Sequence, residues 1–183
     1  MSETVARFEA LAIGVERGFD AIRRRNDGCM ECQKGCSDCC RCRLSITRVE
    51  QANLRRGLAR LPESVRRELA ERATAETQEM CPALDANGAC QVYESRPLIC
   101  RSHGVPLRHR YPVPLVQPTR IDVCEKNFTE VSTNSLPPED VMDQTSLMAE
   151  LAALDVEFCD EHGLAQGERI PLARILVEGV SAT

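Results

Sequence analysis

The chain has 183 residues, of which 43% are hydrophobic and only 3% are aromatic, so we expect a core made mostly of aliphatic side chains. The formal net charge of -5 argues against a general binder of nucleic acid or of anionic lipid. No stretch approaches the roughly 18 uninterrupted apolar residues of a membrane span. The length fits one domain, since domains usually have roughly 100 to 200 residues, and we predict that residues 1–183 form a single compact domain.

The first half of the chain contains three helical patterns. Apolar residues recur at steps of three and four from Val5 to Ile22, which predicts a helix over residues 3–25. Thr47 and Glu50 have the spacing of a capping box, in which each side chain binds the backbone amide of the other residue, so a helix is predicted from 48 to about 60. Pro62 suits the first turn of another helix, to about residue 80.

The middle of the chain has signals for turns and extended segments. Asn87-Gly88, between short apolar runs, predicts a small hairpin that carries Cys81 and Cys90 on opposite arms and brings their sulfurs close together. Five prolines between residues 97 and 118 argue against a long helix there and indicate extended segments or edge strands.

The last part of the chain is predicted to be helical again. A helix should begin at about residue 137, with acids in its first turn, and end at His162-Gly163, and a short helix over about 171–178 should follow. The fold class is therefore mainly α, with a small β-hairpin and irregular cysteine-rich metal-binding loops. In this prediction residues 29–124 form a cysteine-cluster metal-binding core, and residues 1–28 and 137–183 form flanking helices.

Eleven cysteines are the most informative feature of the composition, and six of them lie between residues 29 and 42. The start of the chain has no basic segment followed by an apolar run and a cleavage site, so we expect a cytoplasmic protein. In a reducing compartment a dense set of cysteines more often binds metal than forms disulfides, and an odd number fits disulfides poorly. These observations predict a metal site.

Cysteine spacing indicates how such a site could be built. The two-residue gap between Cys36 and Cys39 lets both thiolates face one ion. Cys39 and Cys40 are adjacent, so their side chains diverge, and two neighbouring ions or one polynuclear cluster would accommodate both. Four thiolates from the first region and four from later loops suffice for two four-coordinate sites: Cys32, Cys36, Cys39 and Cys40, then Cys81, Cys90, Cys100 and Cys124. An all-thiolate shell favours zinc, iron or an iron–sulfur cluster.

Three blocks, CQKGCSDCCR, LSITRVE and CPALDANGACQVYESRPLICRSHG, resemble the CxxCxxCC (YkgJ-type) family, whose name records zinc or iron chelation. The resemblance covers roughly residues 29–124 and implies the same eight cysteine ligands. Three residues rather than two separate Cys32 from Cys36, so Cys29 or Cys42 could take the place of Cys32. Four other residues also match the family blocks: Tyr93, Glu94, Arg96 and Arg101. They either support the thiolates through hydrogen bonds and charge or provide local capping around Pro97.

Three functions fit these features. The first is a protein that chelates zinc or iron, or holds an iron–sulfur cluster, with a redox or catalytic role. The second is a structural zinc module that presents a surface to a protein partner. The third is a dithiol enzyme using Cys36 and Cys39, which would leave the other cysteines unexplained. His103, close after Cys100, is either a ligand or proton carrier at an open site or a structural residue. Metal ions are the predicted partners, and the sequence does not decide whether the protein is an enzyme.

Overall fold

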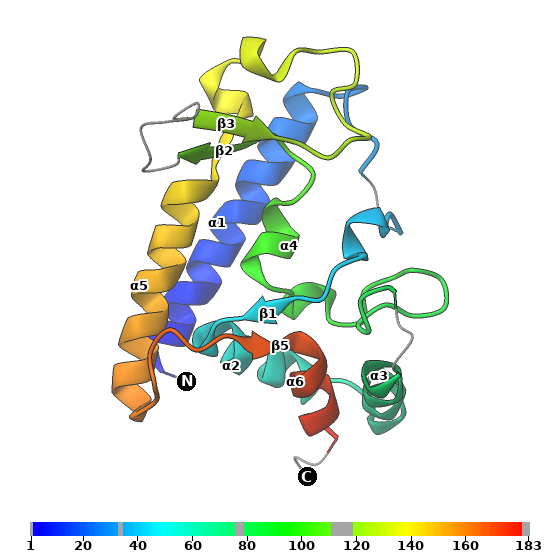
Figure 1. The fold of residues 1–183 in the computed structure, drawn as a ribbon, viewed down its shortest axis with the longest axis vertical. Helices are drawn as coiled ribbons and strands as arrows, with labels where there is room; N and C mark the ends of the chain where they lie inside the picture. The colour runs from blue at the N-terminus through cyan, green and yellow to red at the C-terminus, as the bar shows by residue number, and fades with distance from the viewer. Residues whose placement is uncertain (1, 33–34, 76–78, 111–118, 181–183) are drawn as a thin grey trace. The chain divides into compact units, whose positions relative to one another are not determined.

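A computed structural model describes residues 2–32, 35–75, 79–110 and 119–180 (Figure 1). The chain groups into two compact units, and each is assembled from separate segments. Unit 1 comprises residues 1–9, 34–97 and 154–183, and unit 2 comprises residues 10–33 and 98–153. Helices α1 (Glu3–Arg25) and α5 (Gln144–His162) each contribute residues to both units.

The described residues of unit 1 form three further helices, α2 (Arg48–Leu58), α3 (Glu63–Thr74) and α6 (Leu172–Glu178). Strand β1 (Ser45–Ile46) pairs antiparallel with β5 (Ile170–Pro171), which joins two segments far apart in the sequence. Short 3-10 helices, η1 (Asp38–Cys40) and η2 (Tyr93–Ser95), lie in the cysteine-bearing loops. The buried core is mostly aliphatic, as expected: Ile46, Leu54, Leu58, Leu69, Ala83, Val92, Ile170, Leu172, Ile175 and Leu176.

Unit 2 contains a three-stranded sheet in the order β3-β2-β4. Strand β2 (Leu107–Arg110) pairs antiparallel with β3 (Thr119–Asp122) and parallel with β4 (Met142–Asp143). A short helix, α4 (Leu98–Ser102), precedes the sheet, and η3 (Thr133–Ser135) and η4 (Pro138–Asp140) follow β3. The buried residues of this core are Ile22, Val105, Leu107 and Phe128, with Cys29 and Met30 packed against them.

The mainly α fold class, with small sheets and cysteine-bearing loops, is confirmed. Helix α1 has the predicted bounds. The predicted capping box is also confirmed: the Glu50 amide donates to Thr47 Oγ1 at 3.4 Å, and the Thr47 amide donates to the Glu50 carboxylate at 2.9 Å. Its helix, α2, ends at Leu58. Along the proline-rich segment the described part holds only a short helix, α4, followed by the extended strand β2, and residues 111–118 lie outside the described part.

Three boundaries differ from the predictions. Pro62 is the residue before α3, and the helix ends at Thr74 rather than near residue 80. The predicted hairpin is reduced to one bridge between Leu84 and Cys90, because the Asp85 carboxylate accepts the turn amides of Asn87 and Ala89 in place of strand partners. The helix predicted from 137 begins at Gln144, because residues 142–143 are drawn into the sheet beside β2.

Candidate metal centre

The eight predicted ligands divide between the two units. Cys36, Cys39, Cys40, Cys81 and Cys90 lie in unit 1, and Cys32, Cys100 and Cys124 lie in unit 2. The two residues proposed as substitutes for Cys32 divide in the same way, since Cys29 is in unit 2 and Cys42 in unit 1. All eleven cysteines belong to the described part of the chain, and none of them forms a disulfide there. Each unit is therefore described as a separate candidate site.

In unit 1 a backbone hydrogen bond joins the two cysteine-bearing loops. The Cys81 amide donates to the Cys40 carbonyl at 2.7 Å, so the loop with the adjacent pair Cys39-Cys40 is fixed beside the start of the second loop. The Cys42 thiol donates to the Cys39 carbonyl at 3.5 Å. Four thiols separated by up to 51 positions in the sequence thus come from one pair of contacting loops: Cys39, Cys42, Cys81 and Cys90.

A glycine allows the two loops of unit 1 to approach each other. Gly88 has φ +77°, and a Cβ at this position would lie 3.1 Å from Ser37 Oγ. A side chain here would be strained by the left-handed backbone and crowded by Ser37. The Asn87-Gly88 signal in the sequence therefore corresponds to a turn, which packs against the loop between Cys36 and Cys39.

The environment of Cys81 and Cys90 acts on their thiols in opposing directions. Burial raises the pKa of the Cys81 thiol, the nearby Cys90, Cys42 and Cys39 add to this, and a hydrogen bond with the Ala83 backbone lowers it. Burial also raises the pKa of Cys90, whereas a hydrogen bond with the Val92 backbone and the charge of Arg96 lower it. In both loops the backbone group that lowers the pKa of the cysteine lies two residues after that cysteine. That arrangement supports a thiolate once a cation is present.

In unit 2 three cysteines lie around one turn. The Phe128 amide donates to the Cys29 carbonyl at 2.7 Å, and the Asn127 amide donates to the Cys124 carbonyl at 2.8 Å. The Asn127 side chain donates to Cys32 Sγ at 3.1 Å. Asn127 is the residue that sequence reasoning missed: a single asparagine three positions after a cysteine carries only a general turn preference. Cys100 lies on α4.

In the described residues the cysteine side chains do not converge closely enough to form a complete metal site. Across residues 2–32, 35–75, 79–110 and 119–180, no three Cys, His, Asp or Glu side chains come close enough together to hold one metal ion. The donor chemistry suits a soft ion such as zinc or iron, and Cys39 and Cys42 are exposed. A change of χ1 rotamer moves a sulfur while the backbone stays in place. The residues of unit 1 therefore supply the donor atoms that a thiolate-bound metal needs. For a metal to bind, their side chains would have to rotate toward the ion.

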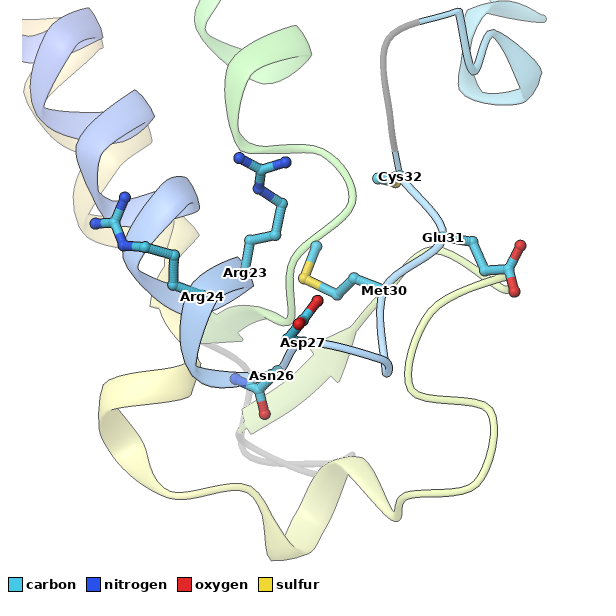
Figure 2. Close-up of a pocket in the computed structure, with 7 residues that line it drawn as sticks. All are labelled: Arg23, Arg24, Asn26, Asp27, Met30, Glu31 and Cys32. Atoms are coloured by element: carbon cyan, nitrogen blue, oxygen red, sulfur yellow. The ribbon is translucent and has the colours of Figure 1, made fainter.

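One wall of unit 2 is open to solvent beside Cys32. A pocket of about 530 Å³ is lined by the end of α1 and the loop that follows: Arg23, Arg24, Asn26, Asp27, Met30, Glu31 and Cys32 (Figure 2). In Figure 2 the Glu31 carboxylate points away from the other labelled side chains. Cys32 can thus be reached by a small solute. In unit 1 Cys90 lines a smaller pocket, of about 280 Å³.

The supporting residues predicted from the family blocks have defined contacts. The Arg96 guanidinium lies 3.6 Å from the centre of the Tyr93 ring, and its charge reaches the Cys90 thiol. Arg101 is buried and forms an ion pair with Glu16. The backbone of His103 forms an isolated β-bridge with Val105. The charge of Arg96 therefore acts to lower the pKa of the Cys90 thiol, whereas for Arg101 the contact described is with a carboxylate.

Comparison with known proteins gives one match. The sequence model of the CxxCxxCC family, described as "Putative zinc- or iron-chelating domain", matches residues 31–134, more than half of the chain. Searches of curated proteins and of solved structures found no match. In the described part of the chain, no helix is both long and apolar enough to cross a membrane.

Proposed function

We propose that this chain, which belongs to the CxxCxxCC family of zinc- or iron-chelating domains, binds its metal through the thiolates named above and uses it in a redox or catalytic role. In this proposal Cys36, Cys39, Cys40, Cys81 and Cys90 are the ligands of unit 1, with Cys42 as a further donor. Cys32, Cys100 and Cys124 are the ligands of unit 2.

The observation that carries the proposal is the set of thiols around Cys81. Three other sulfurs act electrostatically on this half-buried thiol, and each raises its pKa. Without a cation, several thiolates cannot share this site, because burial and mutual repulsion favour the protonated forms. A divalent ion reverses that balance and releases the protons on binding. The arrangement is unfavourable for reactive free thiolates, and a cation would bind these thiols once their side chains turn toward it.

The surrounding protein would hold and balance the ligands. Backbone groups of Ala83 and Val92 hydrogen bond to Cys81 and Cys90, and Arg96 supplies positive charge beside Cys90. Hydrogen bonds and nearby cations of this kind orient metal-bound thiolates and partly neutralise them. Bound iron would supply one-electron chemistry, whereas bound zinc would supply a fixed cross-link between the two loops.

The test is the content of zinc, iron and acid-labile sulfide in protein purified without oxygen. Iron with sulfide in equal amount would identify an iron–sulfur protein. Cys81→Ser should lower the bound metal substantially, because it removes the thiol at the centre of the unit 1 set. Cys159→Ala is the matched control: Cys159 is completely buried, and its thiol contacts the Ala165 carbonyl at 3.6 Å. Metal content that is the same in wild type, Cys81→Ser and Cys90→Ser would refute the assignment.

A structural zinc module is a second candidate, favoured by one observation. Cys81 and Cys90 pack against the hydrophobic core of unit 1. A metal bound there would join the irregular loops to that core, and its binding free energy would add to folding. Zinc without sulfide, together with a large loss of thermal stability on chelation, would support this candidate, and the search for function would then turn to protein partners.

A further inference from the structure

Asn127 is a buried polar side chain at the edge of the cysteine clusters of unit 2. It is only 2% exposed, and both hydrogens of its side-chain amide have acceptors. Oδ1 accepts the Glu31 backbone amide at 2.8 Å. Nδ2 donates to the Gly104 carbonyl at 2.6 Å and to Cys32 Sγ at 3.1 Å. A carbonyl oxygen can only accept, so the contact with Gly104 requires the nitrogen of Asn127 on that side.

The Cys32 sulfur is also confined by Gly104. This glycine has φ +117°, and a Cβ there would lie 3.0 Å from Cys32 Sγ and 3.3 Å from the Phe19 ring. The absence of a side chain at Gly104 thus provides the space that the sulfur occupies, and the amide of Asn127 gives the sulfur its orientation. On another side Cys32 lines the open pocket of about 530 Å³. The sulfur is held by the protein and remains reachable by an ion.

Among the described residues, the two other cysteines at this turn, Cys29 and Cys124, are held through their backbone rather than through their sulfurs. Cys29 and Cys124 are tied to the Asn127-Phe128 turn through their backbone carbonyls. Phe128 has φ 56°, a left-handed conformation uncommon for a residue other than glycine, and its amide donates to the Cys29 carbonyl. The turn therefore fixes the backbone around three cysteines, and it also carries the side chain that donates to the sulfur of Cys32.

We infer that Asn127 is a positioning residue that holds Cys32 as a metal-binding thiolate in unit 2, so that Cys32 rather than Cys29 is the ligand there. The inference rests on the proposed metal-binding function. An N–H···S hydrogen bond stabilises negative charge on sulfur and fixes the direction of the remaining lone pairs. Groups that orient a ligand in this way typically change metal affinity roughly 10- to 100-fold when they are replaced.

Cobalt(II) added to the full chain provides the test, because thiolate-to-cobalt charge-transfer bands report both affinity and the sulfurs that bind. Asn127→Asp keeps the acceptor for Glu31 but places an oxygen against Cys32 Sγ and the Gly104 carbonyl. We expect roughly 10- to 100-fold weaker cobalt binding and a shift of the bands to lower energy. Asn134→Asp makes the same change of charge at an exposed position, and it should leave the cobalt affinity and the energy of the bands unchanged.

Two serine variants test the inference even where Asn127→Asp does not fold. Cys32→Ser should remove charge-transfer intensity, whereas Cys29→Ser should retain it. In the Cys32→Ser background, Asn127→Asp should weaken cobalt binding little further, because the two changes act through one sulfur. Equal bands in Cys32→Ser and wild type, or unchanged affinity in folded Asn127→Asp, would overturn the inference alone. Failure of wild-type protein to bind any metal would overturn the proposed function as well.

Discussion

Gly57 offers a sharp test of the packing in unit 1. It lies inside α2 and faces Ser95 in η2. A Cβ at Gly57 would lie 1.8 Å from Ser95 Oγ and 2.5 Å from Ser95 Cβ. Rotation of the Ser95 side chain can move Oγ but cannot move Cβ, so Gly57→Ala requires a shift of backbone. Ser95 is only 8% exposed, and its carbonyl accepts the Asn53 side chain at 3.3 Å, which opposes that shift.

The expected change in stability follows from two opposing contributions. Alanine is favoured over glycine inside a helix by about 1 kcal/mol. Overpacking of a well-filled site costs about 1 to 3 kcal/mol, and a contact as close as that with Ser95 Cβ belongs near the upper end. Gly57→Ala should therefore destabilise the protein by about 1 to 2 kcal/mol. Gly14→Ala, in α1, is the matched control: nothing lies within 4 Å of its Cβ position, and it should stabilise by about 0.5 to 1 kcal/mol.

Chemical denaturation of both variants, at one fixed concentration of added metal, measures the difference, because bound metal itself shifts apparent stability. Ser95→Gly should offset much of the loss in Gly57→Ala, since the new Cβ would then face only the Ser95 Cα at 3.9 Å. Equal stabilisation by Gly57→Ala and Gly14→Ala would refute the close packing of α2 against η2.

Three other predictions concern a helix cap, an ion pair and the metal. Thr47→Ala should cost about 1 kcal/mol of unfolding free energy through the lost capping box, whereas alanine at the exposed Thr129 should leave denaturation unchanged. Hydrogen bonds from Arg174 and Arg55 to the Glu178 carboxylate lower the pKa of Glu178 from its ordinary value of 4.5. The stabilisation is therefore present above pH 4.5 and lost as the pH falls through the lowered value, so Glu178→Gln should weaken the dependence of stability on acid pH; an identical acid titration would contradict this. Removal of metal should accelerate hydrogen exchange in residues 79–97 and spare the middle of α1, and equal exchange before and after chelation would argue against a metal in unit 1.

Local signals predicted a large part of the fold. The bounds of α1 and the capping box at Thr47 depend on residues within one or two helical turns, so the sequence contains what is needed to predict them. The pairing of β1 with β5 could not be predicted, because each strand has two residues and the partners are far apart in the chain. The start of α5 was placed too early for a similar reason: the Met142 amide binds the distant Pro106 carbonyl at 2.8 Å.

For the candidate site, the cysteine pattern indicated which residue types could bind metal but not how they divide between units. That division depends on long-range contacts, such as the hydrogen bond from the Cys81 amide to Cys40. Asn127 could not be identified either, since its role comes from three partners at residues 31, 32 and 104. The eight-ligand set and the single-domain organisation of residues 1–183 stay predictions.

The composition of unit 1 has a consequence for the timing of synthesis. Its core combines Ile46 and Leu54 with Ile170 and Ile175, and its strand β1 has its partner in β5. A ribosome releases the chain from the N-terminus onward, so the loops with Cys39 and Cys81 are exposed to the cell well before the segment that completes their core emerges. We therefore expect stable metal loading of unit 1 to follow translation. During elongation these thiols would depend on reducing surroundings or on a chaperone to stay unreacted.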